Sequence, residues 1–182
     1  MSITLIVFQG PSASGKSTLQ SLLGLPRVVT WTSRAPRPGE VSGRDYHFAT
    51  RERLEEMFRS GLMIEMNEYK GNYYGTSVQS IRDIIEGGTP MSTVMEAQGA
   101  AAIKAMFPAQ TLLVGVSVCR EECRRRLQER GASAEELERR MAGFEREIEE
   151  LSQCDLIIRN SDDRLEKASS IIEILRKGLL NQ

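Results

Sequence analysis

A glycine-rich motif near the N-terminus, Gly10 to Thr18, constrains the fold of this chain more than any other feature. It reads Gly-Pro-Ser-Ala-Ser-Gly-Lys-Ser-Thr and fits the pattern G-x-x-x-x-G-K-S/T. An apolar run from Ile3 to Phe8, typical of a buried strand, precedes the motif, and leucines at helical spacing follow it. Strand, loop and helix in this order form the context in which the motif binds phosphate. The sequence therefore predicts a P-loop in an α/β fold, in preference to an ordinary glycine turn beside a solvated lysine.

The chemistry of a P-loop depends mainly on its backbone. Glycines let consecutive amide N–H groups surround an anion, and the N-terminus of the following helix adds positive potential. Lys16 is expected to reach the β- and γ-phosphates of a nucleotide, and the Ser17 hydroxyl is expected to bind Mg²⁺. The residues predicted to hold ATP are Gly10, Pro11, Ser12, Ala13, Ser14, Gly15, Lys16, Ser17 and Thr18.

Size and charge exclude several classes of protein. The chain has 182 residues, 40% of them hydrophobic, which suffices for one domain with a sizeable core. Its formal net charge of -1 argues against a dedicated binder of nucleic acid or of anionic membranes. The sequence has no run of about 18 apolar residues and no secretion signal, so we expect no membrane insertion and a cytoplasmic location.

The cysteines do not follow a metal-binding pattern. Cys119, Cys123 and Cys154 are accompanied by a single histidine, His47, that is far away in sequence. The spacing of Cys119 and Cys123 lacks the second ligand pair of a zinc site. We therefore expect reduced thiols.

A segment with two arginines and two prolines follows the first predicted helix. It contains Arg34 and Arg37 beside Pro36 and Pro38, and the prolines fix an extended backbone. Two guanidinium groups on a rigid loop suit the binding of a phosphate group. The residues alone equally allow a solvated basic loop, so both interpretations stay open at this point.

Apolar periodicity predicts strands that alternate with helices along the rest of the chain. Expected strands cover 27–31, 62–67, 91–95, 111–118 and 156–158, and expected helices cover 51–60, 78–86, 98–106, 120–130 and 165–179. A further helix is expected from Ser133 to Leu151, with a capping box formed by Ser133 and Glu136. Glu65 is placed on a different face of its strand from its apolar neighbours, and 71–77 is expected to be a turn. The alternation predicts a mostly parallel sheet flanked by helices.

The chain resembles the guanylate kinase family, whose members are nucleoside monophosphate kinases that move the γ-phosphate of ATP to GMP. The resemblance rests on the P-loop, on TSRAPRPGEVSGRDYHF at 32–48, on GNYYGT at 71–76, on Arg130-Gly131 and on the segment 159–163, and it spans essentially the whole chain. It implies the P-loop nucleoside monophosphate kinase fold, in one domain of three parts. These are a core (1–31, 90–119 and 143–182), an inserted GMP-binding lobe (32–89) and a mobile lid (120–142).

The resemblance also implies roles for individual residues. The phosphate of GMP would be held by a set that we call the acceptor clamp: Arg34, Arg37, Tyr46 and Tyr74. Glu65 would accept hydrogen bonds from the N1–H and the 2-amino group of guanine, and Thr30, Thr76 and Glu96 would complete the base site. The transferring phosphoryl group would be stabilised by Lys16, Arg34, Arg126, Arg130 and Arg140. Asn160 would contact ATP.

Two departures from the family pattern bear on these roles. Where the family has Leu-Asp-Ile-Asp before Gln-Gly, this chain has Thr-Val-Met-Glu at 93–96, followed by Ala97 and then Gln-Gly. One acid is absent and the other is lengthened, so Glu96 either binds guanine or reaches Mg²⁺ through water, and Val94 does neither. The segment from Arg130 to Arg140 is also one residue shorter than usual, which leaves the second lid arginine open between Arg139 and Arg140.

The function that the resemblance implies is an ATP-dependent GMP kinase that uses Mg²⁺ and also accepts dGMP. We expect no nucleic-acid or membrane partner, and the sequence is compatible with both a monomer and a homodimer. Two alternatives are a related P-loop kinase with another phosphorylated acceptor, such as a ribose bisphosphate, and a non-catalytic interaction module. The altered segment 94–96 motivates the first alternative, and the presence of Lys16 and Ser17 opposes the second.

Overall fold

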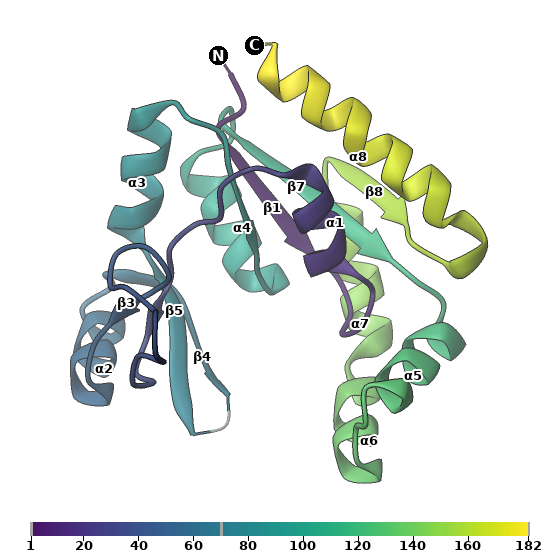
Figure 1. Ribbon diagram of the computed structural model, residues 1–182, viewed down its shortest axis with the longest axis horizontal. Helices are drawn as coiled ribbons and strands as arrows, with labels where there is room; N and C mark the ends of the chain where they lie inside the picture. The colour runs from purple at the N-terminus through teal and green to yellow at the C-terminus, as the bar shows by residue number, and fades with distance from the viewer. Residues whose placement is uncertain (1, 70, 182) are drawn as a thin grey trace.

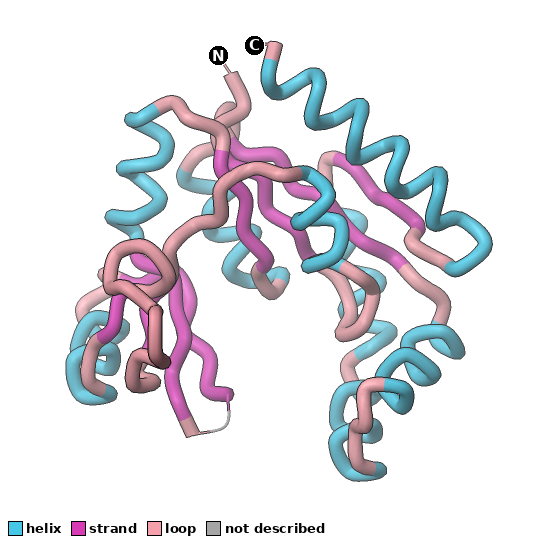
Figure 2. Tube along the Cα trace, in the orientation of Figure 1, coloured by secondary structure: helices cyan, strands magenta, loops and turns pink. Residues whose placement is uncertain are grey.

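The computed structural model describes residues 2–69 and 71–181, and within them the strands form two sheets (Figures 1 and 2). The central sheet contains β1 (Leu5–Gln9), β6 (Met91–Val94), β7 (Thr111–Ser117) and β8 (Leu156–Arg159) in the order β6-β1-β7-β8. Every neighbouring pair of strands in it is parallel. The predicted α/β architecture with a mostly parallel sheet is therefore confirmed.

Helices cover both faces of the central sheet. On one face α1 (Lys16–Leu23) and α8 (Leu165–Leu180) pack against Ile6 and Phe8 of β1. On the other face α3 (Val78–Gly87) and α4 (Ala97–Met106) pack on the side of Leu5 and Val7. All four of these strand side chains are fully buried. Because successive side chains of a strand point to opposite faces, a continuous apolar run is what a strand in the middle layer requires.

A second sheet forms a lobe beside the core. It contains β2 (Trp31–Thr32), β3 (His47–Phe48), β4 (Met63–Tyr69) and β5 (Asn72–Ser77) in the order β3-β2-β5-β4. The helix α2 (Arg51–Arg59) covers this sheet, with Leu54 and Met57 buried against Met63. In Figure 1 the lobe lies below α3, at the left of the view.

Three helices form a second projection on the opposite side of the molecule (Figure 1). They are α5 (Arg120–Glu129), α6 (Ala134–Ala142) and α7 (Phe144–Glu149), and α7 continues into a 3-10 helix, η1 (Glu150–Gln153). A second 3-10 helix, η2 (Asp162–Arg164), precedes α8. Leu127, Met141 and Phe144 form a buried cluster that includes Ala13 of the Gly10 to Thr18 loop. The core of this helical projection therefore packs directly against that loop.

Two of the expected strands differ from those observed. Arg27 makes a single bridge to Ser92 at the edge of the central sheet, and the chain then leaves it, so the strand expected at 27–31 is replaced by the short β2. In β4 a bulge between Met63 and Glu65 shifts the alternation of side chains. Met63 is buried, and Leu62, the first residue of the strand expected at 62–67, is 50% exposed and precedes β4.

Two further differences involve glycines. The segment 71–77, expected to be a turn, is largely the strand β5, and Gly71 with a φ of 75° keeps the turn backbone. A Cβ at position 75 would lie 2.6 Å from the Glu65 carbonyl oxygen, so Gly75 allows β5 to pair closely with β4. The helix expected over 133–151 is interrupted at Gly143. The predicted N-cap is confirmed, because the Ser133 hydroxyl accepts the N–H of Glu136.

Within the described ranges, 2–69 and 71–181, no helix has the length and hydrophobicity needed to cross a membrane. The thiols of Cys119, Cys123 and Cys154 are free.

Candidate active site

The loop from Gly10 to Lys16 has a backbone that only glycine tolerates at two positions. Gly10 has a φ of 141° and Gly15 has a φ of 96°. A Cβ at position 10 would lie 2.3 Å from the carbonyl oxygen of Val116, and a Cβ at position 15 would lie 2.1 Å from Asn160 Nδ2. The motif glycines are therefore required both by the conformation of the loop and by the close approach of β7 and of the Asn160 side chain.

Donor groups engage the carbonyl oxygens of the loop. Lys16 Nζ donates to the carbonyls of Gly10 and Pro11, at 2.6 and 2.8 Å. Three donors from outside the loop bind the next three carbonyl oxygens. Cys123 Sγ donates to the carbonyl of Ser12 at 2.9 Å, and Arg126 Nη1 donates to that of Ala13 at 3.4 Å. Asn160 Nδ2 donates to the carbonyl of Ser14 at 2.7 Å. In a trans peptide unit the N–H points away from the C=O. Carbonyls held outward therefore leave the N–H groups of Ala13 and Gly15 directed to the inside of the loop, which is the arrangement that an anion-binding loop requires.

Lys16 is the cation at the centre of the site. Burial lowers the pKa of its ammonium group, and the negative charges of Glu147 and Glu96 partly oppose that shift. Glu96 was predicted from the sequence to be part of the site. Glu147, on α7, was not, because the sequence signal of that segment is an apolar stripe and Glu147 lies off it.

A cavity of about 480 Å³ lies between the loop, the lobe and α7. Its lining includes Gly10, Ser12, Lys16, Glu65, Asn67, Val94, Glu96, Gln98, Arg146, Glu147 and Glu150. The structure thus brings the predicted Lys16, Glu65 and Glu96 to one cavity, although they come from α1, from β4 and from the N-terminus of α4. The cavity thus combines carboxylates, which can accept hydrogen bonds from a ligand, with the cations Lys16 and Arg146, which can attract negative charge.

Glu65 is the carboxylate with the most unusual surroundings in this cavity. The Thr76 hydroxyl donates to its Oε1 at 3.4 Å, and its Oε2 is buried without a hydrogen-bond partner among the described residues. Burial, followed by the charge of Glu96, raises the pKa of Glu65 from 4.5 to about 7. Gly99 of α4 leaves room for it, because a Cβ there would lie 2.7 Å from Oε2. A buried acceptor in a cavity is suited to a ligand that brings hydrogen-bond donors.

The structure groups most of the predicted acceptor clamp in the lobe. The Arg34 guanidinium lies 5.5 Å from the centre of the Tyr46 ring, and the Tyr46 and Tyr74 rings are 6.1 Å apart. Arg37 lies on the same loop as Arg34, and it is exposed. Thr30 precedes β2, where its carbonyl accepts the N–H of His47 at 2.8 Å, and it does not belong to the cavity lining.

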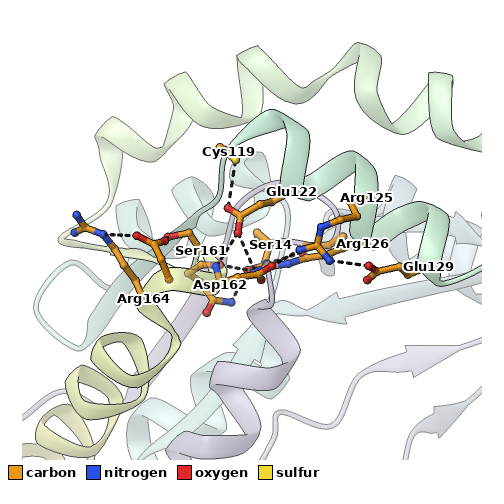
Figure 3. Close-up of polar contacts among 12 residues, drawn as sticks. Ser14, Cys119, Glu122, Arg125, Arg126, Glu129, Ser161, Asp162 and Arg164 are labelled. Atoms are coloured by element: carbon orange, nitrogen blue, oxygen red, sulfur yellow. Dashed lines mark hydrogen bonds and ion pairs between the residues drawn. The ribbon is translucent and has the colours of Figure 1, made fainter.

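The lid arginines lie outside the larger cavity. Figure 3 shows Arg126 pointing to the segment that follows β8, where its Nη2 donates to the carbonyl of Asn160 at 2.9 Å and to Asp162 Oδ1 at 2.7 Å. Arg140 pairs with Glu136 of its own helix at 2.7 Å, and Arg139 is exposed. Sequence reasoning missed Arg146 of α7, which lines the cavity.

A second cavity, of about 250 Å³, lies on the other side of the loop. Its lining includes Ala13, Gly15, Thr18, Arg126, Arg130, Asn160 and Asp162. The loop therefore separates two spaces, one lined by carboxylates of the lobe and of α7, the other by arginines at the end of α5 and by the segment after β8. Lys16, the first residue of α1, lines the larger space, and the next two residues of the helix, Ser17 and Thr18, are half-buried and exposed respectively.

A P-loop between a parallel strand and a helix, with a second small sheet on one side and the helices α5 to α7 on the other, defines a P-loop nucleotide kinase. A family model described as guanylate kinase matches residues 2–177. Curated guanylate kinases that are similar include one from Rubrobacter xylanophilus, 38% identical over 95% of this chain and 93% of the relative, and one from Lactococcus lactis, 38% identical over 93% and 86%. The crystal structure of guanylate kinase from Anaplasma phagocytophilum superposes with a TM-score of 0.66 at 29% identity, covering 98% of this chain and 86% of that one. The chain belongs to the guanylate kinase family.

Proposed function

We propose that this chain transfers the γ-phosphate of ATP to GMP, and also to dGMP, giving ADP and the nucleoside diphosphate. The observation that carries this proposal is the half-buried Glu65, which shares a cavity with Lys16 of the P-loop. A nucleoside monophosphate kinase needs a site for a base that carries donor groups and a site for phosphates, and both must lie in the same space.

The acceptor base is selected by the charge of Glu65. Guanine presents an N1–H and a 2-amino group, both donors, whereas adenine presents an acceptor at N1 and lacks the 2-amino group. Hydrogen bonds to a charged group contribute about 1.5 to 3 kcal/mol each, so two of them separate guanine from adenine by roughly two to four powers of ten. Thr76 holds one oxygen of the carboxylate, and Glu96 lies at the same cavity.

The donor nucleotide would occupy the P-loop from its other side. Its phosphates would be bound by the loop N–H groups and by Lys16, which exchanges the carbonyls of Gly10 and Pro11 for phosphate oxygens. Its nucleoside would extend toward the second cavity, which Asn160 and Arg130 line. This arrangement leaves the first cavity to the acceptor and places the two phosphates on either side of Lys16.

Mg²⁺ fits the residues beside the P-loop. Ser17 is exposed at the first turn of α1 and offers a hydroxyl oxygen, a donor of the hard type that Mg²⁺ prefers. The part of the chain that the structure describes has no cluster of three or more metal-binding side chains, which suits an ion held chiefly by phosphates, water and one or two protein oxygens. When bound with ATP, Mg²⁺ would neutralise charge on the phosphates. Val94 offers it no ligand, and Glu96 could reach it only through water.

Transfer to GMP needs no general base. The second pKa of a phosphate monoester is about 6, so the nucleophilic oxygen is already ionised at neutral pH. What the chain supplies is alignment and positive charge, which are the main contributions to catalysis of phosphoryl transfer. The acceptor clamp would hold the phosphate of GMP, and Lys16 would bind the transferring group. We assign Arg126, Arg130 and Arg140 to its further neutralisation when the lid (120–142) moves over the core and excludes water.

An assay of ADP release tests this function. With Mg²⁺ and ATP, GMP is expected to stimulate ADP release far more than AMP, CMP, UMP or a ribose bisphosphate. Glu65→Gln keeps the size of the side chain but presents a donor to guanine, so the preference for GMP over AMP is expected to fall about 100-fold. Equal stimulation by GMP and AMP in the unmodified protein would refute the proposal.

A further inference from the structure

Glu40, on the loop between β2 and β3, contacts two members of the acceptor clamp. Nη2 of Arg34 lies 2.9 Å from both Oε1 and Oε2 of Glu40. The backbone N–H of Arg37 donates to Glu40 Oε2 at 2.7 Å. The Arg34 and Glu40 side chains are only 15% and 19% exposed, so this ion pair is partly shielded from water. One carboxylate thus connects the side chain of one clamp arginine to the backbone of the other.

The position of this carboxylate is fixed by the turn that carries it. The Glu40 N–H donates back to the carbonyl of Arg37 at 3.0 Å, so the two residues are joined by reciprocal hydrogen bonds. Gly39, with a φ of 88°, supplies the left-handed backbone between them, and Pro38 restricts the turn further. The carboxylate is therefore a rigid point of attachment for Arg34.

The Arg34 guanidinium is held on several sides. Besides Glu40, its Nη1 donates to the carbonyl of Ala35 at 2.7 Å. Its centre lies 5.5 Å from the Tyr46 ring centre and 5.9 Å from that of Phe48. Glu40, followed by other groups that include Tyr74, raises the pKa of Arg34. An unattached arginine samples many rotamers, whereas this one is oriented before any ligand arrives.

We propose that Glu40 is a positioning residue of the acceptor clamp: it orients the Arg34 guanidinium, and it fixes the backbone at Arg37, before the phosphate of the acceptor nucleotide binds. The proposal rests on the proposed function, because it takes the clamp to bind that phosphate. Glu40 itself contacts no substrate in this scheme. Its carboxylate also repels the incoming phosphate. Repulsion and orientation change the affinity for GMP in opposite directions when the charge of Glu40 is removed, so the sign of the change distinguishes them.

The test separates the phosphate from the nucleoside. Calorimetry would give the dissociation constants of GMP and of guanosine. The dissociation constant of guanosine divided by that of GMP is the ratio that measures how much the phosphate adds to binding. Glu40→Gln keeps the shape of the side chain and loses its charge, so the ratio is expected to fall about tenfold, through weaker binding of GMP with guanosine unchanged. Glu40→Asp retains the charge on a shorter side chain and is expected to recover part of the ratio.

Asp45→Asn is the matched control. Asp45 belongs to the same loop, accepts the N–H of Val41 at 2.8 Å and pairs with Arg44. Among the described residues its carboxylate forms no hydrogen bond or ion pair with Arg34 or Arg37. Its ratio is expected to equal that of the unmodified protein. A lower ratio in this control as well would mean that any loss of charge in the loop acts through the fold.

Three outcomes would overturn the positioning role. They are an unchanged ratio in Glu40→Gln, a higher ratio, which would make Glu40 a competitor of the phosphate, and equal weakening of GMP and guanosine, which would indicate damage to the lobe. Failure of the proposed function is distinct from these. In that case the unmodified protein would already bind GMP no better than AMP.

Discussion

Glu65 is expected to destabilise the ligand-free protein at neutral and alkaline pH. Its pKa is about 7 in the folded protein, against an ordinary value of 4.5. A carboxyl whose pKa is raised by folding binds its proton more tightly in the folded state, so ionisation above that pKa favours the unfolded chain. The difference between the two pKa values corresponds to roughly 3 kcal/mol, since one pKa unit is about 1.4 kcal/mol.

The size of this effect depends on pH in a calculable way. At pH 8 nearly the whole penalty of about 3 kcal/mol is present, because both states are ionised. At pH 5 the folded state is protonated and the unfolded state is largely ionised, which leaves a penalty of about 1 kcal/mol. Glu65→Gln removes the titration, so relative to the unmodified protein it should gain about 2 kcal/mol of stability between pH 5 and pH 8.

Urea denaturation of both proteins at pH 5 and pH 8, without nucleotide, measures this difference. Glutamine leaves a polar group at the same place, and any penalty from that is the same at both pH values and cancels. The reasoning would be refuted if the stability difference between Glu65→Gln and the unmodified protein were the same at pH 5 and pH 8. Confirmation would mean that the charge used to select guanine is maintained at a cost to the stability of the empty protein.

Three other perturbations follow from the contacts of the site. Asn160→Ala removes the donor to the Ser14 carbonyl, and the unpaired buried carbonyl should disturb the loop. The KM for ATP should therefore rise about tenfold, with the KM for GMP little changed. An unaltered KM for ATP would contradict this. Gly99→Ala places a Cβ against Glu65, so calorimetry should show weaker binding of GMP and unchanged binding of ATP. An unchanged affinity for GMP would contradict the role of Glu65 in binding it. Asp162→Ala removes the ion pair of Arg126 at 2.7 Å and leaves that arginine its bonds to carbonyl oxygens, so protease cleavage within 120–142 should increase. Unchanged cleavage would show that the ion pair does not fasten this segment.

Patterns that involve neighbouring residues predicted the architecture well. The run before Gly10 gave β1 because a strand covered on both faces must be apolar throughout. The N-cap at Ser133 and the closing helix after η2 were likewise readable, since capping and helical periodicity are local. Leu165, the first residue of α8, is 49% exposed, and the buried face of the helix is formed by Ala168, Ile172 and Leu179.

Features that depend on distant contacts were not readable from the sequence. The strand β5 was mistaken for a turn because its glycines are a turn signal, and Gly75 is instead required by the approach of β4. The bulge at Met63 follows from pairing with β5 and has no local signature. Arg126 was expected to face the phosphates, and its present bonds to Asn160 and Asp162 depend on two segments meeting in space. Whether it reaches the phosphates in the closed lid stays a prediction.

The most direct test of the central claim is a calorimetric titration of the unmodified protein with GMP and with AMP, at pH 8, where Glu65 is ionised. Two hydrogen bonds to the carboxylate predict that GMP binds at least about 100-fold more tightly than AMP. Equal dissociation constants for the two nucleotides would contradict the assignment of Glu65 as the group that recognises guanine.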